Sequence, residues 1–145
     1  MLTGPQLPSL DRLSRFLSAL GMTFETVGPG RVVAWMELGP DQHTPWGVVH
    51  GGAYTTAIES AASVGASAAV LERGQFAVGV NNTTDFLRPL VRGRVQVIAE
   101  PIFQGASQQL WEVRVTRAED GKLLARGQVR LQNVELPASL RDESR

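Results

Sequence analysis

A single carboxylate, Glu59, stands in a segment that is otherwise small and apolar. Ala57, Ile58, Ala61 and Ala62 surround it, and no other acidic residue occurs between positions 41 and 72. Burying an unpaired carboxylate is costly, so such an acid is paired, exposed on a local polar face, or retained for chemistry. A helical glutamate usually faces solvent, but the alanines here leave little polar face. We therefore favour a chemical role for Glu59.

Two glycines, Gly51 and Gly52, open the same segment. Glycine N–H groups at a helix start are unpaired and unobstructed, and the positive end of the helix dipole lies behind them. Such groups stabilise a developing oxyanion, although a glycine pair alone more often marks a tight turn. His50 could be a ligand, but a histidine here is more typical of a capping or loop-orienting residue. Gly51 together with Glu59 indicates a site more strongly than either residue alone.

The segment from Ala53 to Glu72 is predicted to be one long helix. Alanine is its commonest residue, it contains no proline, and Arg73 and Gly74 follow it as a basic residue and a terminating glycine. At 1.5 Å per residue the helix is about 30 Å long. Because its sequence is small and apolar nearly all round, we expect it to be buried on most sides.

Gly51 and Glu59 are too far apart on one helix to act on the same carbonyl. The eight residues between them span about 12 Å of axial rise, which exceeds the reach of a glutamate side chain. Either the two act on different parts of a substrate, or Gly51 of one subunit meets Glu59 of another across a two-fold axis. Ser63, one turn after Glu59 on the same face, is placed to hold that carboxylate or a water.

A short N-terminal helix is predicted before Gly21. Its capping signal is Pro8-Ser9, and its apolar residues recur at helical spacing, so they should lie on the rest of the domain. These residues are Leu13, Phe16, Leu17 and Leu20.

Six strands are predicted around the long helix. Residues 24–27 and 31–38 form a hairpin, whereas residues 39–50, with two prolines and two glycines, form an irregular loop. After Gly74 the apolar residues alternate, and Asp120-Gly121 marks a hairpin between the last two strands. The four later strands are centred on 76–86, 95–99, 111–115 and 125–131. This order excludes a parallel doubly wound sheet and predicts an α+β domain with an antiparallel sheet and one buried helix.

Composition narrows the classes of protein that remain. The chain has 145 residues, no cysteine and two histidines, so thiol nucleophiles and most transition-metal sites are excluded. Its 14 basic and 14 acidic residues cancel, which removes the global charge typical of proteins that bind nucleic acid or anionic lipid. The sequence shows no export signal or spanning segment, so a cytoplasmic protein without membrane partners is expected. We predict one domain over residues 1–136 and a polar, irregular tail over 137–145.

The stretch around Glu59 resembles the motif of the hot-dog thioesterases of the phenylacetate-degradation and hydroxybenzoyl-CoA class. In that family His-Gly-Gly enters the central helix and an acid follows eight residues after the first glycine. His50-Gly51-Gly52 and Glu59 match this spacing, and Ser63 stands where the family often has Ser or Thr. The stretches 78–81 and 86–89 are also similar to that family's strand after the helix and its Arg-Pro exit. The resemblance covers residues 20–133.

The resemblance implies a hot-dog fold, in which an antiparallel sheet of about six strands wraps around one long central helix. It implies hydrolysis of an acyl-CoA thioester, aryl or medium-chain, with the Gly51 N–H polarising the carbonyl and Glu59 as nucleophile or general base. It also implies a site shared across a homodimer, which we expect to pair again into a homotetramer. Hydrolysis needs no cofactor or metal. His50, Gly52 and Trp46 complete the expected site.

One position departs from the family pattern. Where the family has Gln or Asn seven residues before the first glycine, this chain has Thr44, which is shorter and presents no amide. Gln42 and His43 lie close enough to substitute if the loop is rearranged, with lower activity or a different substrate. Arg88 could bind a CoA phosphate bidentately, although a solvated strand-end arginine is the slightly favoured interpretation.

Two other functions stay open from the sequence. A hot-dog hydratase or dehydratase needs a histidine facing the acid, which His50 could supply only if its loop folds inward. A non-catalytic acyl-CoA sensor would use the same pocket, but such regulators usually carry a DNA-binding segment, and the first twenty residues hold no helix-turn-helix. Trp46, Tyr54 and Phe86 could line an aryl or aliphatic acyl pocket and are equally suitable as core.

Overall fold

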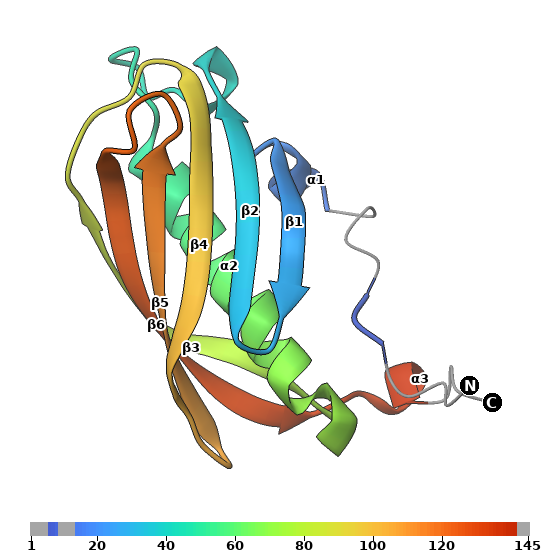
Figure 1. The fold of residues 1–145 in the computed structure, drawn as a ribbon. Helices are drawn as coiled ribbons and strands as arrows, with labels where there is room; N and C mark the ends of the chain where they lie inside the picture. The colour runs from blue at the N-terminus through green and yellow to red at the C-terminus, as the bar shows by residue number, and fades with distance from the viewer. Residues whose placement is uncertain (1–5, 9–13, 142–145) are drawn as a thin grey trace.

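The computed structural model describes residues 6–8 and 14–141. A six-stranded antiparallel sheet with strand order β1-β2-β4-β5-β6-β3 curves around one long helix, α2 (Figure 1). Helix α2 contacts all six strands, and the strands β1 and β3 form the two edges of the sheet. The α+β architecture expected from the sequence is therefore confirmed.

The elements follow the predicted order but are longer than the periodic segments that revealed them. The strands are β1 (Met22–Gly28), β2 (Arg31–Leu38), β3 (Gln75–Phe86), β4 (Gly93–Gln104), β5 (Gln108–Arg117) and β6 (Leu123–Glu135). The helices are α1 (Arg15–Ser18), α2 (Gly51–Val70) and α3 (Ala138–Arg141), with the short 3-10 turns η1 (Pro40–Gln42) and η2 (Leu71–Arg73).

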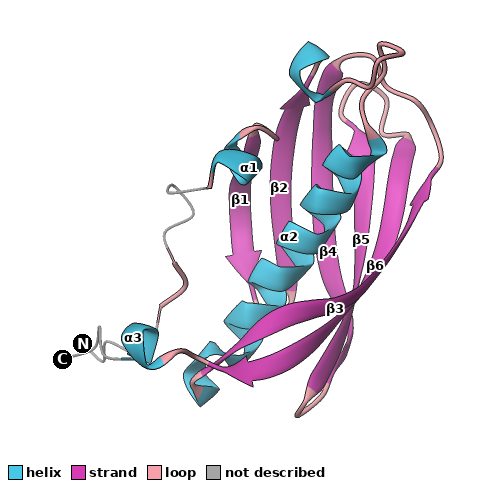
Figure 2. Ribbon diagram, turned by 180° about the vertical axis from the view of Figure 1, so that it is seen from behind, coloured by secondary structure: helices cyan, strands magenta, loops and turns pink. Residues whose placement is uncertain are grey.

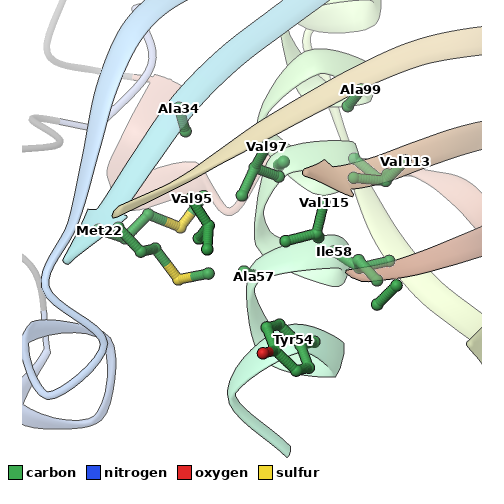
Figure 3. Packing of buried hydrophobic residues seen from close by; sticks show 14 of the residues in the cluster. Met22, Ala34, Tyr54, Ala57, Ile58, Val95, Val97, Ala99, Val113 and Val115 are labelled. Carbon is green, nitrogen blue, oxygen red and sulfur yellow. The ribbon is translucent and has the colours of Figure 1, made fainter. Parts of the chain in front are cut away.

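The core lies between α2 and the concave face of the sheet (Figure 3). The small residues of the helix let it approach the strands closely. A Cβ atom at Gly65 would lie 2.5 Å from the Trp111 ring, and one at Gly127 of β6 would lie 2.6 Å from Ile58. Neither distance is compatible with a side chain, so both glycines are required by close packing rather than by a turn.

A buried polar network crosses the core near the C-terminal end of α2. The Trp111 indole N–H donates to Gln109 Oε1 at 2.9 Å, and Gln109 Nε2 donates to the Ala66 carbonyl and to Asn133 Oδ1, each at 2.9 Å. Asn133 Nδ2 in turn donates to the carbonyl of Gly105 in the β4–β5 turn. Because all of these polar groups are paired, they tie the helix to β5 and β6 without the cost of unpaired burial.

Helix α1 differs from its prediction. Its cap is Ser14, whose Oγ accepts from the Leu17 N–H at 3.2 Å, whereas the expected cap at Ser9 and the stripe residue Leu13 lie outside the described residues. Phe16 is 68% exposed, so its expected packing is wrong. A helix of one turn can present only a narrow face, and Leu17 occupies it.

Helix α2 also differs from its prediction, both in its bounds and in its burial. It begins at Gly51 rather than Ala53 and ends at Val70, followed by the turn η2 and by Gly74 with φ of +71°. Its buried residues cover only part of its circumference, and Glu59 is among the exposed ones. Because β3 is the edge of the sheet, no further strand of the described chain covers the helix beyond it.

The loop before α2 and the C-terminal tail are more regular than the sequence predicts. The loop 39–50 contains η1 and an isolated bridge between His43 and Val49, and the polar tail contains α3. The predicted hairpin at Asp120-Gly121 is confirmed, with φ of +72° at the glycine. None of the helices within the described ranges is long and apolar enough to cross a membrane.

Replacing Gln109 by leucine should lower the free energy of unfolding by about 2–4 kcal/mol, because the Trp111 N–H and Asn133 Oδ1 would lose their buried partners. Urea unfolding followed by Trp fluorescence measures this change. The matched control is Gln128→Leu on the exposed face of β6, for which we expect a change within about 0.5 kcal/mol. Equal stability of the two variants would show that the network contributes nothing.

Candidate active site

His50 is the N-cap of α2, and its side chain uses one of the two glycine N–H groups. His50 Nδ1 accepts from the Gly52 N–H at 2.8 Å. The capping interpretation of this histidine is therefore supported, and the expectation that both glycines present free N–H groups is wrong. None of the hydrogen bonds among the described residues involves the Gly51 N–H, which points out of the first turn as helix geometry requires.

The side chains of Gln42 and His43, the two candidates to replace the amide that the family has at position 44, hold the loop before α2 in place. Gln42 Oε1 accepts from the Gly39 N–H at 2.9 Å, and Gln42 Nε2 donates to the Ala19 carbonyl at 2.6 Å. His43 Nε2 lies 2.6 Å from the carbonyl oxygen of Val91. Both side chains thus hold the loop against neighbouring segments.

Thr44 has a local structural role. Its Oγ1 accepts from the Trp46 N–H at 3.2 Å, and its backbone N–H donates to the Val48 carbonyl at 2.7 Å. These bonds close the turn in which Gly47 adopts φ of +78°. Trp46 at the tip of this turn is 85% exposed, so within the described chain it does not join Tyr54 and Phe86.

Glu59 lies over the edge strand. Its carboxylate covers Gly79 of β3 so closely that a Cβ atom there would be 3.2 Å from Glu59 Oε1. The side chain is exposed, and no hydrogen bond or ion pair between described residues includes it. The prediction that the helix has little solvated surface at Glu59 is therefore wrong. The carboxylate is nevertheless free to accept a proton.

A polar stripe with four-residue spacing runs along α2, and α2 lies beside β3 (Figure 2). Ser67 Oγ accepts from the Ala77 N–H at 3.0 Å at one end of β3, and the Thr55 carbonyl accepts from Asn82 Nδ2 at 3.2 Å near its middle. The helix and the strand therefore run antiparallel, side by side. The stripe consists of Gly51, Thr55, Glu59, Ser63 and Ser67.

The structure adds Gly79 of β3 to the site beside Phe86, the residue of this strand that the sequence had indicated. Gly79 makes room for the Glu59 carboxylate, and the Phe86 ring lies over Gly51, 3.0 to 3.4 Å from where a Cβ atom would be. The repeated spacing of four between polar residues in an alanine-rich helix was the available signal. Because each step of four residues turns about 40° further around the axis, the stripe winds around α2 as it follows β3.

Two predicted residues keep open roles. Ser63 is half-buried one turn after Glu59, and the bonds among described residues do not include its hydroxyl. Arg88 is exposed, and its Nη1 donates to the Leu123 carbonyl at 2.6 Å. This bond fixes the exit of β3, as the strand-end interpretation predicts, and leaves the other guanidinium N–H groups facing solvent.

An aromatic pair lies beside the Gly51 N–H. Tyr54, one turn into α2, is 3% exposed, and its ring centroid is 6.4 Å from that of Phe86, which is 56% exposed. Burial of the Tyr54 hydroxyl raises its pKa to about 12. The pair provides an apolar wall at the N-terminal end of the stripe.

No group of three or more histidine, aspartate or glutamate side chains gathers among the described residues in a way that could hold a metal ion. The candidate site combines the Gly51 N–H, the Glu59 carboxylate, the Ser63 hydroxyl and the aromatic pair.

Comparison with known proteins places this geometry in a family. The thioesterase superfamily model matches residues 46–124, which includes the whole polar stripe. The Mycobacterium tuberculosis protein named "Putative esterase Rv1847" is 46% identical over 122 residues, covering 83% of this chain and 86% of the relative. A 1,4-dihydroxy-2-naphthoyl-CoA hydrolase of Listeria monocytogenes is 33% identical over 105 residues, covering 72% and 84%.

Solved structures agree with this assignment. The structure of the same Mycobacterium protein covers 86% of this chain and 99% of its own with a TM-score of 0.81. The thioesterase HI1161 of Haemophilus influenzae is 28% identical, covers 94% of this chain and 96% of its own, and has a TM-score of 0.78. By family model, sequence identity and fold, this chain belongs to the thioesterase superfamily and has the hot-dog fold.

Proposed function

We propose that this protein hydrolyses an acyl-CoA thioester to the free acid and CoA. The proposal rests on two groups that lie beside the same edge strand. The Gly51 N–H donates to no described residue, and the Glu59 carboxylate has no partner among the described residues. A similar protein in Listeria is named as a hydrolase of an aromatic acyl-CoA, which favours CoA as the carrier and an aryl group among the candidate acyl groups.

The chemistry follows from the charge that develops on the thioester carbonyl. The Gly51 N–H, at the positive end of the α2 dipole, stabilises the oxyanion that forms when the carbonyl carbon is attacked. Glu59 either removes a proton from the attacking water or attacks the carbon itself, forming an anhydride that water then opens. The C–S bond breaks, and the departing thiolate takes up a proton as CoA leaves.

The alternative hydratase function is weakened by the histidines. His50 Nδ1 is occupied by the Gly52 N–H, and His43 Nε2 by the Val91 carbonyl. Proton transfer at carbon needs a histidine that faces the acid, and both rings are instead oriented by backbone groups.

A homodimer would complete the site. Because about 12 Å of helix separates Gly51 from Glu59, one carbonyl can meet both only if a second chain supplies one of them. The β3 edge is the natural contact, since an unpaired edge of 12 residues offers backbone groups to another strand. Pairing of two such dimers into a tetramer stays a prediction, and so does a cytoplasmic location.

Two contacts between α2 and β3 set the register in which the β3 strands of two subunits would pair. Glu59 covers Gly79, and Gly51 lies under Phe86, so an antiparallel pair in which Gly79 faces the partner subunit's Phe86 brings one subunit's carboxylate to the other's N–H. Because the bulge between Gly79 and Asn81 counts as one step of the ladder, the two-fold axis then passes through the point where Thr83 faces its own copy. A two-fold pair has two equal sites.

The remaining predicted residues surround this shared site. Arg88 follows Phe86 at the end of β3 and would bind a CoA phosphate through its free N–H groups. Ser63 would hold the Glu59 carboxylate or the attacking water. Trp46 and Gly52 would contact the substrate, Trp46 from the exposed loop and Gly52 from the first turn of α2, whereas Thr44 and His50 would keep that loop and turn in place.

Glu59→Gln should leave the fold intact and lower kcat by about 10² or more, because an amide can neither accept the proton nor attack the carbonyl. Turnover of a panel of aryl- and acyl-CoA thioesters, followed by thiol release, measures it. Glu72→Gln, an exposed acid in η2, is the matched control and should retain full activity. Wild-type turnover by the Glu59 variant would reject the catalytic assignment.

Mixing two inactive variants should restore activity if the site is shared. A heterodimer of Glu59→Ala and Gly51→Pro subunits contains one site with both groups intact, and random exchange gives about a quarter of the wild-type site density. Proline deletes the N–H while fitting the first turn of a helix. Gly51→Ala is the control, because it adds the same Cβ contact with Phe86 but keeps the N–H.

The mixed sample is compared with each variant alone after subunit exchange has been demonstrated by mass. Activity at the level of the separate variants would mean that both residues serve the same chain's site. Loss of activity in Gly51→Ala as severe as in Gly51→Pro would mean that the Phe86 contact, and not the N–H, is what the substitution destroys.

Thr83→Cys should form a disulfide-linked dimer on mild oxidation, since the proposed axis brings the two copies of this residue to about one strand spacing. The chain has no cysteine of its own, so non-reducing electrophoresis detects this bond alone. Arg114→Cys on the exposed face of β5 is the control and should show no disulfide crosslink under the same conditions. Equal crosslinking of both variants would argue against the β3 contact.

A further inference from the structure

The edge strand β3 carries an asparagine that faces the long helix. Asparagine is depleted in strands, yet Asn82 lies in the polar run Asn81-Asn82-Thr83-Thr84 in the second half of β3. Its side chain is half-buried, and its Nδ2 donates to the Thr55 carbonyl of α2 at 3.2 Å. A polar bond between helix and strand at this place needs a reason beyond strand formation.

A β-bulge at Val80 turns Asn82 towards the helix. The pairing of β3 with β6 shifts after Gly79, so Val80 is an extra residue in the ladder. Without it, residues 79 and 82 would lie on opposite faces of the strand, because side chains alternate. In the structure both face α2, since the β6 residues opposite them are buried. The bulge thus puts the Asn82 amide and the space for the Glu59 carboxylate on the same side.

The Thr55 carbonyl connects Asn82 to Glu59. In an α-helix each carbonyl accepts the N–H four residues later, so the Thr55 carbonyl is the acceptor for the Glu59 backbone N–H. It takes a second hydrogen bond from Asn82, which a carbonyl oxygen with two lone pairs can do. The Asn82 amide therefore anchors to β3 the turn of helix from which the Glu59 side chain projects.

The orientation of the Asn82 amide is fixed by Thr84. Thr84 Oγ1 donates to Asn82 Oδ1 at 2.7 Å, so the amide oxygen is committed to Thr84 and the NH₂ group is turned to the helix. The hydroxyl lies over Gly127 of β6, where a Cβ atom would be 3.0 Å from it. Gly127 thus leaves the room in which Thr84 holds the amide.

Each chain has one donor and one acceptor left over in this pair. Asn82 Nδ2 has two N–H groups, and the bonds among the described residues use one of them. The Thr84 hydroxyl gives its only proton to Asn82, so its lone pairs are free to accept. Since β3 is the edge of the sheet (Figure 2), a protein partner for these groups lies beyond that edge.

In the proposed dimer the free donor meets the free acceptor. Thr83 faces its own copy at the axis, so one step away on the helix side Asn82 faces the partner subunit's Thr84. Side chains directly opposite in an antiparallel pair have Cβ atoms about 4.5–5.5 Å apart, which is within reach of an N–H···O hydrogen bond. The two-fold axis makes this contact twice.

We propose that Asn82 is a positioning residue for Glu59, held by Thr84 within its own chain and by the partner subunit's Thr84 across the axis. This inference rests on the proposed thioesterase function and its β3 dimer. The two copies of α2 are joined through four polar side chains, so dimer formation sets the position of Glu59 in both sites.

The consequence concerns the rate of the chemical step rather than substrate binding. A general base or nucleophile has to lie within hydrogen-bond reach of its target, and a misplacement of about 1 Å costs about 10²-fold in rate. Asn82 acts through the backbone of the helix, so its loss displaces Glu59 and leaves the other contacts of the substrate in place.

Asn82→Ala should lower kcat by about tenfold or more and change KM by less than about threefold. Turnover of the thioester that the wild type hydrolyses fastest measures both. Asn81→Ala is the matched control, because Asn81 Oδ1 accepts from Thr83 Oγ1 at 3.1 Å in the same two-residue arrangement on the outer face of β3. It should retain the wild-type kcat.

Thr84→Val and Thr84→Ser separate the hydroxyl from the shape of the side chain. Valine is a β-branched residue that strands favour, so Thr84→Val should fold even if Asn82→Ala does not. It should lower kcat by about tenfold, whereas Thr84→Ser keeps the hydroxyl and should stay within about threefold of wild type. Wild-type kcat in Thr84→Val would overturn the inference.

A double variant tests whether Asn82 acts through Glu59. Adding Asn82→Ala to Glu59→Gln should leave the residual kcat of Glu59→Gln unchanged to within about twofold, because the group that would be misplaced is already absent. A further tenfold loss would show a role independent of the carboxylate, and the positioning assignment would be wrong.

Mixing Asn82→Ala with Thr84→Val subunits tests the contact across the axis without turnover. Each variant homodimer lacks both hydrogen bonds across the axis, whereas the heterodimer keeps one, between the intact Asn82 of one subunit and the intact Thr84 of the other. Random exchange gives half heterodimers. If one bond strengthens the dimer about threefold, native mass spectrometry should show about three quarters. A fraction at the statistical half after complete exchange would overturn the inference, as would a wild-type protein that stays monomeric.

The two readouts separate this inference from the proposed function. An excess of heterodimer in a protein that hydrolyses none of the thioesters would leave the contact across the axis standing and reject the hydrolase assignment. Hydrolysis at the wild-type rate by Asn82→Ala and Thr84→Val, with heterodimers at the statistical half, would leave the hydrolase standing and reject the positioning role of Asn82.

Discussion

The close approach of α2 to the sheet is the constraint on which the rest of the molecule depends. Gly65 lies against Trp111, and Ile58 lies against Gly127, at distances where one added methyl group would collide. Interiors packed to this density tolerate few rotations of a helix. The contacts therefore fix which face of α2 is turned to β4, β5 and β6, and the polar stripe that contains Gly51 and Glu59 is left beside β3.

The edge strand β3 consequently borders the candidate site. A central strand would cover the stripe with a further neighbour, whereas β3 leaves its outer side unpaired and the Glu59 carboxylate accessible. The feature that makes an isolated β3 a liability, a row of unpaired backbone groups, is also what would allow a second copy to complete the site in the proposed dimer. In that proposal, fold and mechanism are linked through the free edge of the sheet.

Much of this arrangement was predictable because it depends on local periodicity and on glycine. The alternating strands, the Asp120-Gly121 turn and the alanine-rich helix follow from residue spacing alone. The capping role of His50 was predicted from its place before the helix, whereas the exposure of Glu59 was not, because it depends on which strand is the edge. The structural bonds of Gln42 likewise join segments far apart in sequence.

The two ends of the core treat buried polar groups differently, and the difference is informative. At the C-terminal end of α2, Gln109 is buried with its donors and acceptor satisfied by the protein itself. At the N-terminal end, Tyr54 is buried with none. An apolar side chain in place of Gln109 would leave the Trp111 N–H and Asn133 Oδ1 unpaired. The paired group stabilises one packing of helix and sheet, whereas burial of the Tyr54 hydroxyl carries a cost that no hydrogen bond among the described residues offsets.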